Sequence, residues 1–380
     1  MSIGTNKSFY IFLSLILISA ASIACVDNRP FEEQLQSVLE KGIQKHDVKG
    51  VSAAVIGPGQ KTWLGTAGIS HDTVPVDPGM VSAIGSITKN AVSALTLRLA
   101  EEGVLSLGDP LSRWLPEYQN VDSRTTIRQL LNHSSGIYMF WSNQKIWDDL
   151  KKDRTKIWTP EEVLSYIDKP YFEPGQGFRY SNTNYLLLAM IIQEATGSSL
   201  ADELRNRFWH PLNLNDTWLA IQEKIPVNQI HIWGDNWNND GSYIDMTFLP
   251  RTAHDCICFG SGSFFMTAEN LAMWGHALFE GRVLSPESMT EMLKYVDTGR
   301  GGNMEAYGLG VQKFRSRVTG GEIGIGHAGG GKGSVAYMVY LPDHHVTIAV
   351  MANESNSRCA EYVVNNLVKK TVENLFQEVK

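Results

Sequence analysis

VAYMVYLPDHHVTIAVM, residues 335–351, is the stretch that decides the fold. Two runs rich in β-branched and aromatic residues, 335–341 and 346–351, have the composition of strands. The residues between them, Pro342-Asp343-His344-His345, include a proline and an aspartate, which favour a tight turn. The stretch therefore predicts two antiparallel strands joined as a hairpin.

The sequence on either side of this hairpin extends the same architecture. Residues 360–376 carry valine and leucine at helical spacing and predict a closing helix, and residues 307–313 predict a further strand. At the other end of the chain, residues 31–46 predict an amphipathic helix, and residues 51–56 and 61–68 predict a second hairpin. Together these segments predict an α+β fold, in which an antiparallel sheet is flanked by terminal helices.

The middle of the chain has a different character. Residues 86–299 are richer in helices and loops, and we interpret them as a mostly helical lobe. This helical lobe is inserted between the two halves of an α/β lobe, which comprise about residues 30–85 and 300–380. We therefore expect residues 25–380 to form a single catalytic domain. A cleft between the two lobes is the expected place for a site. The predicted helices of the middle segment are 86–102, 184–196 and 268–280.

The overall composition excludes one class of partner. The formal net charge is -7, the sequence pI is about 5.8, and no run of lysine and arginine occurs. Because nucleic acids are bound by clustered positive charge, we do not expect one as a partner. Hydrophobic residues make up 43% of the chain, which is enough for a sizeable core.

The N-terminus has the features of an export signal. Lys7 provides a positive start, residues 9–24 carry no charge, and small side chains precede Cys25. The apolar run is too short for a typical membrane span, so residues 1–24 predict a signal peptide. Cys25 is either a plain residue or the lipid-carrying cysteine of a bacterial lipoprotein. The expected location is periplasmic or extracellular.

Three further cysteines, Cys256, Cys258 and Cys359, do not form a disulfide scaffold. Their number is odd, so at least one stays unpaired unless Cys25 joins them, and the pairing stays open. His254 lies close to Cys256 and Cys258, but no second ligand pair has zinc-site spacing. We therefore expect neither a metal nor a cofactor.

Ser86-Ile87-Thr88-Lys89 has the S-x-x-K spacing of a serine nucleophile with a lysine partner. Positions i and i+3 share a face at the start of a helix, so the lysine amine can reach the serine oxygen. A neutral lysine can then activate the hydroxyl, and the helix N-terminus favours the alkoxide. The alternative is an ordinary N-cap serine. A second copy, from Ser142 to Lys145, lies in a polar stretch that we interpret as surface.

Tyr180-Ser181-Asn182 follows a Pro-Gly turn and leads into an apolar helix, a placement that suits a loop edge facing a cleft. The phenol of Tyr180 could exchange protons with Ser86 and with a leaving group. The amide of Asn182 could hold a substrate amide. The alternative for Tyr180 is a packed aromatic side chain.

His327-Ala328-Gly329-Gly330 precedes a predicted strand. Its glycines would let a substrate lie against the backbone as an added strand. The N–H of Gly330 could join that of Ser86 in an oxyanion hole. The alternative is a glycine-rich hairpin with an incidental histidine.

The three motifs occur in the order nucleophile, tyrosine loop and glycine motif. On these residues the chain resembles the serine penicillin-recognising enzymes, in the branch of class C β-lactamases, D-alanyl-D-alanine carboxypeptidases, D-aminopeptidases and related esterases. The resemblance covers roughly residues 32–375 and implies the β-lactamase/transpeptidase-like fold. It also implies roles: Ser86 is the acylated nucleophile, Lys89 and Tyr180 share proton transfer, and Asn182 contacts the substrate amide.

At one position the chain departs from the typical pattern of this family. His327 occupies the place of the lysine in the K-T-G motif of this family, with Gly329 and Gly330 beside the substrate. With a histidine at this position the chain resembles the peptidase and esterase branches of the family. This resemblance implies weaker β-lactam hydrolysis. It would place a group that titrates near neutral pH where lysine would stay charged. His133, which lies in a stretch similar to a family turn, is interpreted as structural.

Three functions remain open on the sequence. We favour a hydrolase acting on small D-amino-acid peptides, esters or amides, and the alternatives are a true β-lactamase and a catalytically silent penicillin-binding or sensing module. All five predicted functional side chains are present, which argues against the silent module. Trp141 and Trp147 lie in an aromatic segment, and Trp233 and Trp237 lie in a long loop. If these segments border the cleft, the pocket suits an aromatic or apolar group.

Overall fold

The computed structural model describes Met1 and residues 29–235, 242–299, 302–355 and 357–378. Cys25 and the predicted signal peptide, apart from Met1, lie outside these residues. In the part of the chain that is described, no helix has both the length and the apolar character needed to cross a membrane.

The predicted C-terminal hairpin is confirmed at the centre of a nine-stranded sheet. β13 (Ser334–Leu341) pairs antiparallel with β14 (Val346–Ala352), and Leu341 lies opposite Val346 at the turn. The strand order is β3-β2-β1-β14-β13-β12-β11-β10-β9, so N-terminal strands pair directly with C-terminal ones. The other strands are β1 (Gly50–Ile56), β2 (Thr62–His71), β3 (Val74–Pro75), β9 (Val296–Asp297), β10 (Met304–Tyr307), β11 (Gln312–Phe314) and β12 (Ile325–Gly331).

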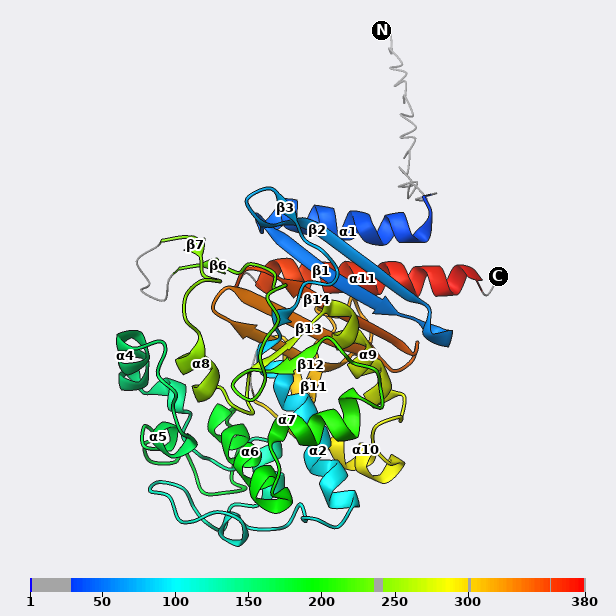
Figure 1. The fold of residues 1–380 in the computed structure, drawn as a ribbon. Helices are drawn as coiled ribbons and strands as arrows, with labels where there is room; N and C mark the ends of the chain where they lie inside the picture. The colour runs from blue at the N-terminus through cyan, green and yellow to red at the C-terminus, as the bar shows by residue number, and fades with distance from the viewer. Residues whose placement is uncertain (2–28, 236–241, 300–301, 356, 379–380) are drawn as a thin grey trace.

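Helices cover both faces of this sheet (Figure 1). α1 (Phe31–His46) and α11 (Ser357–Glu378) pack together on one face, as the sequence predicts for the terminal helices. α9 (Ala268–Phe279) packs on the other face, against β1, β13 and β14. Every residue of β13 and β14 is therefore buried. The sequence prediction places α9 in the helical lobe of residues 86–299, and this assignment is wrong. The helix packs on the large sheet instead, and Gly275 allows it to approach Met338 closely.

The remaining helices form the second lobe below the sheet in Figure 1. A small sheet has the strand order β4-β8-β5, and its strand β4 comes directly before the turn that carries Ser86. The lobe contains α2 (Thr88–Glu101), α3 (Ile127–Leu131), α4 (Gln144–Lys152), α5 (Pro160–Leu164), α6 (Asn182–Thr196), α7 (Leu200–Leu204), α8 (Thr252–Ile257) and α10 (Pro286–Met292), with β4 (Ser82–Ala83), β5 (Thr217–Leu219) and β8 (Phe264–Met266). The short pair β6 (Trp233–Gly234) and β7 (Ile244–Asp245) lies beside the large sheet instead, where the Trp233 N–H donates to the Asn353 carbonyl at 2.9 Å (Figure 1).

The prediction of one strand over residues 307–313 is wrong. Gly308 N–H donates to Val311 at 2.7 Å, and the resulting turn separates β10 from β11. Gly310 has a φ of 74°, in the left-handed region that favours glycine. Its carbonyl accepts a hydrogen bond from Asn90 of α2 at 3.2 Å. The turn is therefore stabilised by a contact with a distant helix, which a local pattern of apolar residues does not reveal.

Candidate active site

Ser86 lies in a single 3-10 turn, Gly85–Ile87, between β4 and α2. Gly85 has a φ of 52°, which lets the chain reverse sharply before the helix. Hydrogen bonds join both flanks of the turn to Phe264 of β8. The Ile84 N–H donates to the Phe264 carbonyl at 3.0 Å, and the Phe264 N–H donates to Thr88 Oγ1 at 3.2 Å. The turn therefore holds the serine in a fixed position at the start of α2.

Lys89 lies one turn further along, directly against Ser86. Its Nζ is 2.9 Å from Ser86 Oγ and donates to the carbonyl of Ser261 at 2.6 Å. The side chain is completely buried. Burial lowers the pKa of Lys89 to about 7, while the nearby Cys258 acts in the opposite direction. A substantial fraction of Lys89 is therefore neutral at physiological pH and able to accept the serine proton.

We expect the rate of acylation at Ser86 to rise with pH through a single step near the pKa of Lys89, about 7. Below that pH the amine is protonated and cannot accept a proton; above it the amine is free. The ionisable groups around the amine are Tyr180, Tyr185, Cys258 and His327. The measurement is the rate of covalent labelling by a fluorophosphonate across pH 5–9. A labelling rate that shows no rise between pH 5 and 9 would contradict a base with a pKa of about 7.

Tyr180 faces the same pair. Its ring centroid lies 4.9 Å from Lys89 Nζ, and its hydroxyl forms a hydrogen bond with Ser86. Burial raises the pKa of Tyr180 far above its ordinary value, an effect that the bond to Ser86 partly offsets. The phenol is therefore protonated at neutral pH. It suits the role of proton donor, whereas Lys89 suits the role of base.

His133 holds the tyrosine loop in place. Its Nδ1 accepts the N–H of Ser181 at 3.2 Å and lies 3.1 Å from Asn184 Nδ2. Its ring packs on Tyr180, with 4.3 Å between the centroids. His133 is fully buried and does not line the cavity described below. These contacts support the interpretation of His133 as a structural residue.

Asn182 begins α6 and lines the cavity with Ser86. Its Oδ1 is buried and has no hydrogen-bond partner among the described residues. Buried polar atoms are normally paired, so an unpaired oxygen here can accept the N–H of a substrate amide. Asn182 accordingly remains a predicted substrate contact.

The glycine motif precedes the predicted strand, β13, and residues 327–330 themselves lie within a further strand, β12, that the sequence does not predict. This strand passes directly over the Ser86 turn. A Cβ at Gly329 would lie 1.9 Å from the Ile84 carbonyl oxygen and 3.0 Å from Ser86 N, and a Cβ at Gly85 would lie 2.7 Å from Gly330 N. Only glycine allows the strand and the turn to approach this closely.

Gly329→Ala should lower the acylation rate by about 10²-fold or more, since even a shift of about 1 Å in a catalytic group has an effect of that size. The added methyl group would collide with the backbone before Ser86. The matched control on the same strand is Gly331→Ala, where a Cβ would meet nothing within 4 Å among the described residues. Fluorophosphonate labelling rates and melting temperatures of both variants test this. Equal labelling of the two would show that the close approach is not needed.

His327 requires a correction. Its Nε2 lies 3.0 Å from the Tyr307 hydroxyl and its Nδ1 lies 2.6 Å from the Ala328 carbonyl. Burial, and then the charge of Lys89, lower the pKa of His327 to about 3. The histidine is thus neutral at physiological pH instead of titrating near 7. It is fully buried and does not line the cavity with Ser86. Its role in substrate binding stays a prediction, and the geometry favours an indirect role through Tyr307.

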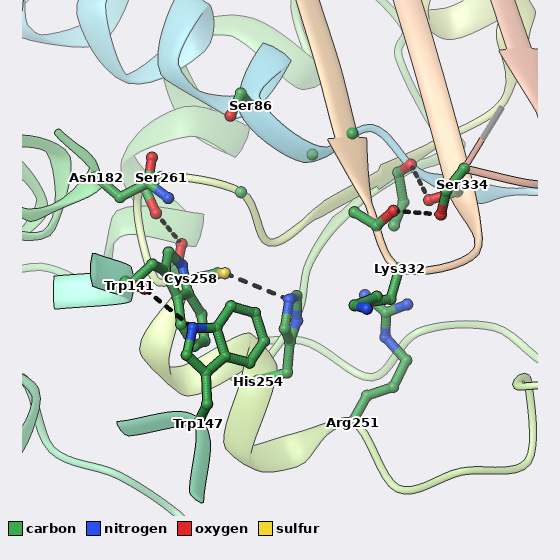
Figure 2. Close-up of a pocket in the computed structure, with 16 residues that line it drawn as sticks. Ser86, Trp141, Trp147, Asn182, Arg251, His254, Cys258, Ser261, Lys332 and Ser334 are labelled. Atoms are coloured by element: carbon green, nitrogen blue, oxygen red, sulfur yellow. Dashed lines mark hydrogen bonds between the residues drawn. The ribbon is translucent and has the colours of Figure 1, made fainter. Parts of the chain in front are cut away.

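A cavity of about 490 Å³ lies in front of Ser86. Figure 2 shows Ser86 and Asn182 on one side of it, with Trp147 and His254 opposite. Trp141 and Trp147 both line it, and their ring centroids are 4.3 Å apart. Trp233 does not line it; its indole N–H donates to the Ser70 carbonyl at 2.8 Å. The predicted segment that carries Trp141 and Trp147 therefore borders the cavity, and Trp237 of the second segment lies outside the described residues.

Sequence reasoning missed two residues of this site. The carbonyl of Ser261 anchors the Lys89 amine, and the Tyr307 hydroxyl contacts His327. The Gly260-Ser261-Gly262 sequence is the only local signal for Ser261. The described cysteines Cys256, Cys258 and Cys359 are free thiols, and among the described residues no cluster of three or more His, Cys, Asp or Glu could hold a metal ion.

Comparisons with known sequences agree with this geometry. A model of the β-lactamase family matches residues 35–366. A penicillin-binding protein of Bacillus subtilis (strain 168) is 29% identical over 338 residues, which cover 85% of this chain and 72% of that protein. A teichoic acid D-alanine hydrolase of Staphylococcus aureus is 24% identical over 296 residues, which cover 77% of this chain and 67% of that protein.

Solved structures show the same fold. A D-stereospecific amidohydrolase from Streptomyces sp. matches with a TM-score of 0.76 and 28% identity, over 87% of this chain and 98% of that one. The D-amino acid amidase from Ochrobactrum anthropi SV3, complexed with L-phenylalanine amide, matches with a TM-score of 0.79 and 26% identity, over 92% of this chain and 99% of that one. The predicted β-lactamase/transpeptidase-like fold is thereby confirmed.

Proposed function

The chain belongs to the β-lactamase family, and on that premise we propose that it is an exported serine hydrolase that cleaves small amides or esters through an acyl-enzyme on Ser86. The observation that carries the proposal is the 2.9 Å contact between Lys89 Nζ and Ser86 Oγ beside a cavity of about 490 Å³. A buried amine whose pKa is lowered to about 7 is a base matched to neutral pH.

The proposed reaction proceeds in two steps. Neutral Lys89 accepts the hydroxyl proton as Ser86 Oγ attacks the substrate carbonyl, and the N–H groups of Ser86 and Gly330 stabilise the oxyanion. Tyr180 donates a proton to the leaving amine or alcohol, and the proton held by Lys89 replaces it. Water then attacks the acyl ester by the same proton transfers in reverse, which releases the acid and restores Ser86.

The proposed substrates are amides or esters of D-amino acids with an aromatic or apolar side chain. Trp141 and Trp147 provide an aromatic wall of the cavity, which favours stacking with such a group. Two structural relatives support the D configuration: one is named a D-stereospecific amidohydrolase and the other a D-amino acid amidase. The unpaired Asn182 Oδ1 would accept an N–H of the substrate.

The test combines intact-mass spectrometry with turnover. The wild-type protein and a Ser86→Ala control are treated with a fluorophosphonate, a penicillin, and the D and L forms of phenylalanine amide. We expect one fluorophosphonate adduct that is absent in Ser86→Ala, and hydrolysis of the D amide in preference to the L amide. A long-lived penicillin adduct supports the peptidase or esterase assignment. Rapid turnover of penicillin would instead identify a β-lactamase, and a folded protein without any adduct would identify a silent binding module.

The same spectra test export. We propose that residues 1–24 are removed and that residues 25–380 form the mature catalytic domain. The mature mass in the native host is then expected to begin at Cys25, either unmodified or carrying lipid. An uncleaved N-terminus would overturn the export proposal without affecting the assignment of Ser86.

A further inference from the structure

A second group of reactive side chains faces the cavity of Ser86. Cys258 Sγ lies 3.6 Å from His254 Nε2, and His254 Nδ1 lies 3.1 Å from Asp255 Oδ1. Figure 2 shows Cys258 and His254 pointing toward each other, and both line the cavity. A thiol, an imidazole and a carboxylate in this order form the arrangement that activates a cysteine nucleophile.

Neighbouring residues hold the imidazole of His254 in this orientation. Arg251 Nη2 donates to Asp255 Oδ1 at 3.1 Å, and the Trp141 ring stacks on His254 with 5.8 Å between the centroids. Burial lowers the pKa of His254, but Cys258 and Asp255 outweigh burial and raise it to about 9. The imidazole is thus protonated at neutral pH, which places a cation beside the sulfur. Cysteines beside a protonated histidine react readily with electrophiles.

The thiol lies close to the nucleophilic serine. The carbonyl of Cys258 accepts the N–H groups of Ser261 at 2.8 Å and Gly262 at 2.9 Å, which fixes the end of α8. A methyl group at Gly262 would lie 3.8 Å from Cys258 Sγ and also 3.8 Å from the carbonyl carbon of Gly85. Gly262 therefore bridges the space between the sulfur and the turn that carries Ser86.

We propose that Cys258 is a second nucleophile in this cavity: a thiol that small, soft electrophiles such as haloacetamides modify, and whose adduct blocks access to Ser86. With iodoacetamide, the sulfur forms a bond to the methylene carbon as the carbon–iodine bond breaks. Iodide leaves with the bonding electron pair, and His254 holds the thiol proton. The modification itself does not depend on the proposed hydrolase function; only the blocking of Ser86 does.

The other two described cysteines lack this environment. Cys256 lies on the same helix but does not line the cavity, and burial raises its pKa. Cys359 is completely buried in α11, and burial raises its pKa to about 12. Both therefore serve as internal controls for a selective reaction at Cys258.

The experiment uses the full chain with Cys25→Ser, which leaves three of the four cysteines. The protein is treated with iodoacetamide at neutral pH, and the modified residue is identified by peptide mapping. We expect one carbamidomethyl group, on Cys258, which is absent in Cys258→Ser and present in the matched Cys256→Ser. His254→Gln should slow the reaction roughly 10-fold or more, because glutamine cannot carry the positive charge that His254 places beside the sulfur. His254→Asn provides a second variant, and circular dichroism verifies that each variant is folded.

Labelling with a fluorophosphonate then tests whether the adduct blocks Ser86. The alkylated wild-type background should lose this labelling, whereas Cys258→Ser should be labelled at the same rate with and without the iodoacetamide treatment. Modification of Cys256 or Cys359 before Cys258, an unmodified protein, or an unchanged rate in both folded histidine variants would overturn the proposal. Continued fluorophosphonate labelling of the alkylated protein would overturn the blocking step. If Cys258 reacts but untreated protein takes no fluorophosphonate, the hydrolase proposal alone fails.

Discussion

Lys89→Met should lower the rate of acylation at Ser86 by about 10³-fold while the protein stays folded. Methionine has a similar length but cannot accept the proton that Lys89 takes from Ser86 Oγ, 2.9 Å away. The side chain is completely buried, so an apolar replacement removes an amine that is costly to bury. The variant also removes the hydrogen bond that Lys89 donates to the Ser261 carbonyl. The loss of this bond offsets part of the stability gained by removing the buried amine.

Lys89→Arg separates the two roles that Lys89 can have. Arginine keeps a positive charge but does not lose its proton near neutral pH, so it cannot act as the base. If Lys89 acts as the base, both variants lose labelling by a fluorophosphonate. If Lys89 only supplies a positive charge, the arginine variant keeps most of the rate. The time course of adduct formation by intact mass, together with the melting temperature of each variant, decides between these outcomes.

Tyr180→Phe should lower amide hydrolysis by roughly 10²- to 10³-fold. Burial raises the pKa of Tyr180, so its proton is available for the leaving amine at neutral pH. A nitrophenyl ester has a leaving group that needs no proton, and its hydrolysis should therefore fall much less. The ratio of the amide rate to the ester rate is the diagnostic measurement, because a merely misfolded site would lower both rates together.

Tyr185→Phe is the matched control for this prediction. The Tyr185 hydroxyl lies 2.9 Å from Ser93 Oγ and donates to the Leu131 carbonyl at 2.9 Å, so it connects helices and does not touch Ser86. Its loss should lower the melting temperature and leave the amide-to-ester ratio near the wild-type value. A change in that ratio as large as in Tyr180→Phe would assign the proton transfer to a wider tyrosine network instead.

Much of the architecture follows from local sequence pattern. The runs at 335–341 and 346–351 are strands β13 and β14, and the pattern at 31–46 is α1. Ser86 and Lys89 meet because a spacing of three residues at a helix start places two side chains on one face, which needs only local geometry. These features were predictable because each depends on neighbours within a few residues.

Other features depend on long-range packing. The strand predicted over 307–313 is interrupted because Gly310 docks against Asn90 of α2. The glycine motif lies inside β12 because its small residues allow the strand to pass over the Ser86 turn. The position of α9 on the sheet also depends on a close contact, at Gly275. None of these partners is near in sequence, so pattern alone could not locate them.

The sequence by itself determined which residue types could react and in what order they occur: Ser86 with Lys89, then Tyr180 and Asn182, then His327. The tertiary structure decided their ionisation and exposure. In the folded protein His327 is buried and its pKa falls to about 3, and the pKa of Lys89 falls to about 7. Folding also brings His254 and Cys258, which show no metal-site pattern in the sequence, to the cavity of Ser86. The physical reason is that pKa and access depend on desolvation and on charges from distant segments, which exist only once the chain has folded.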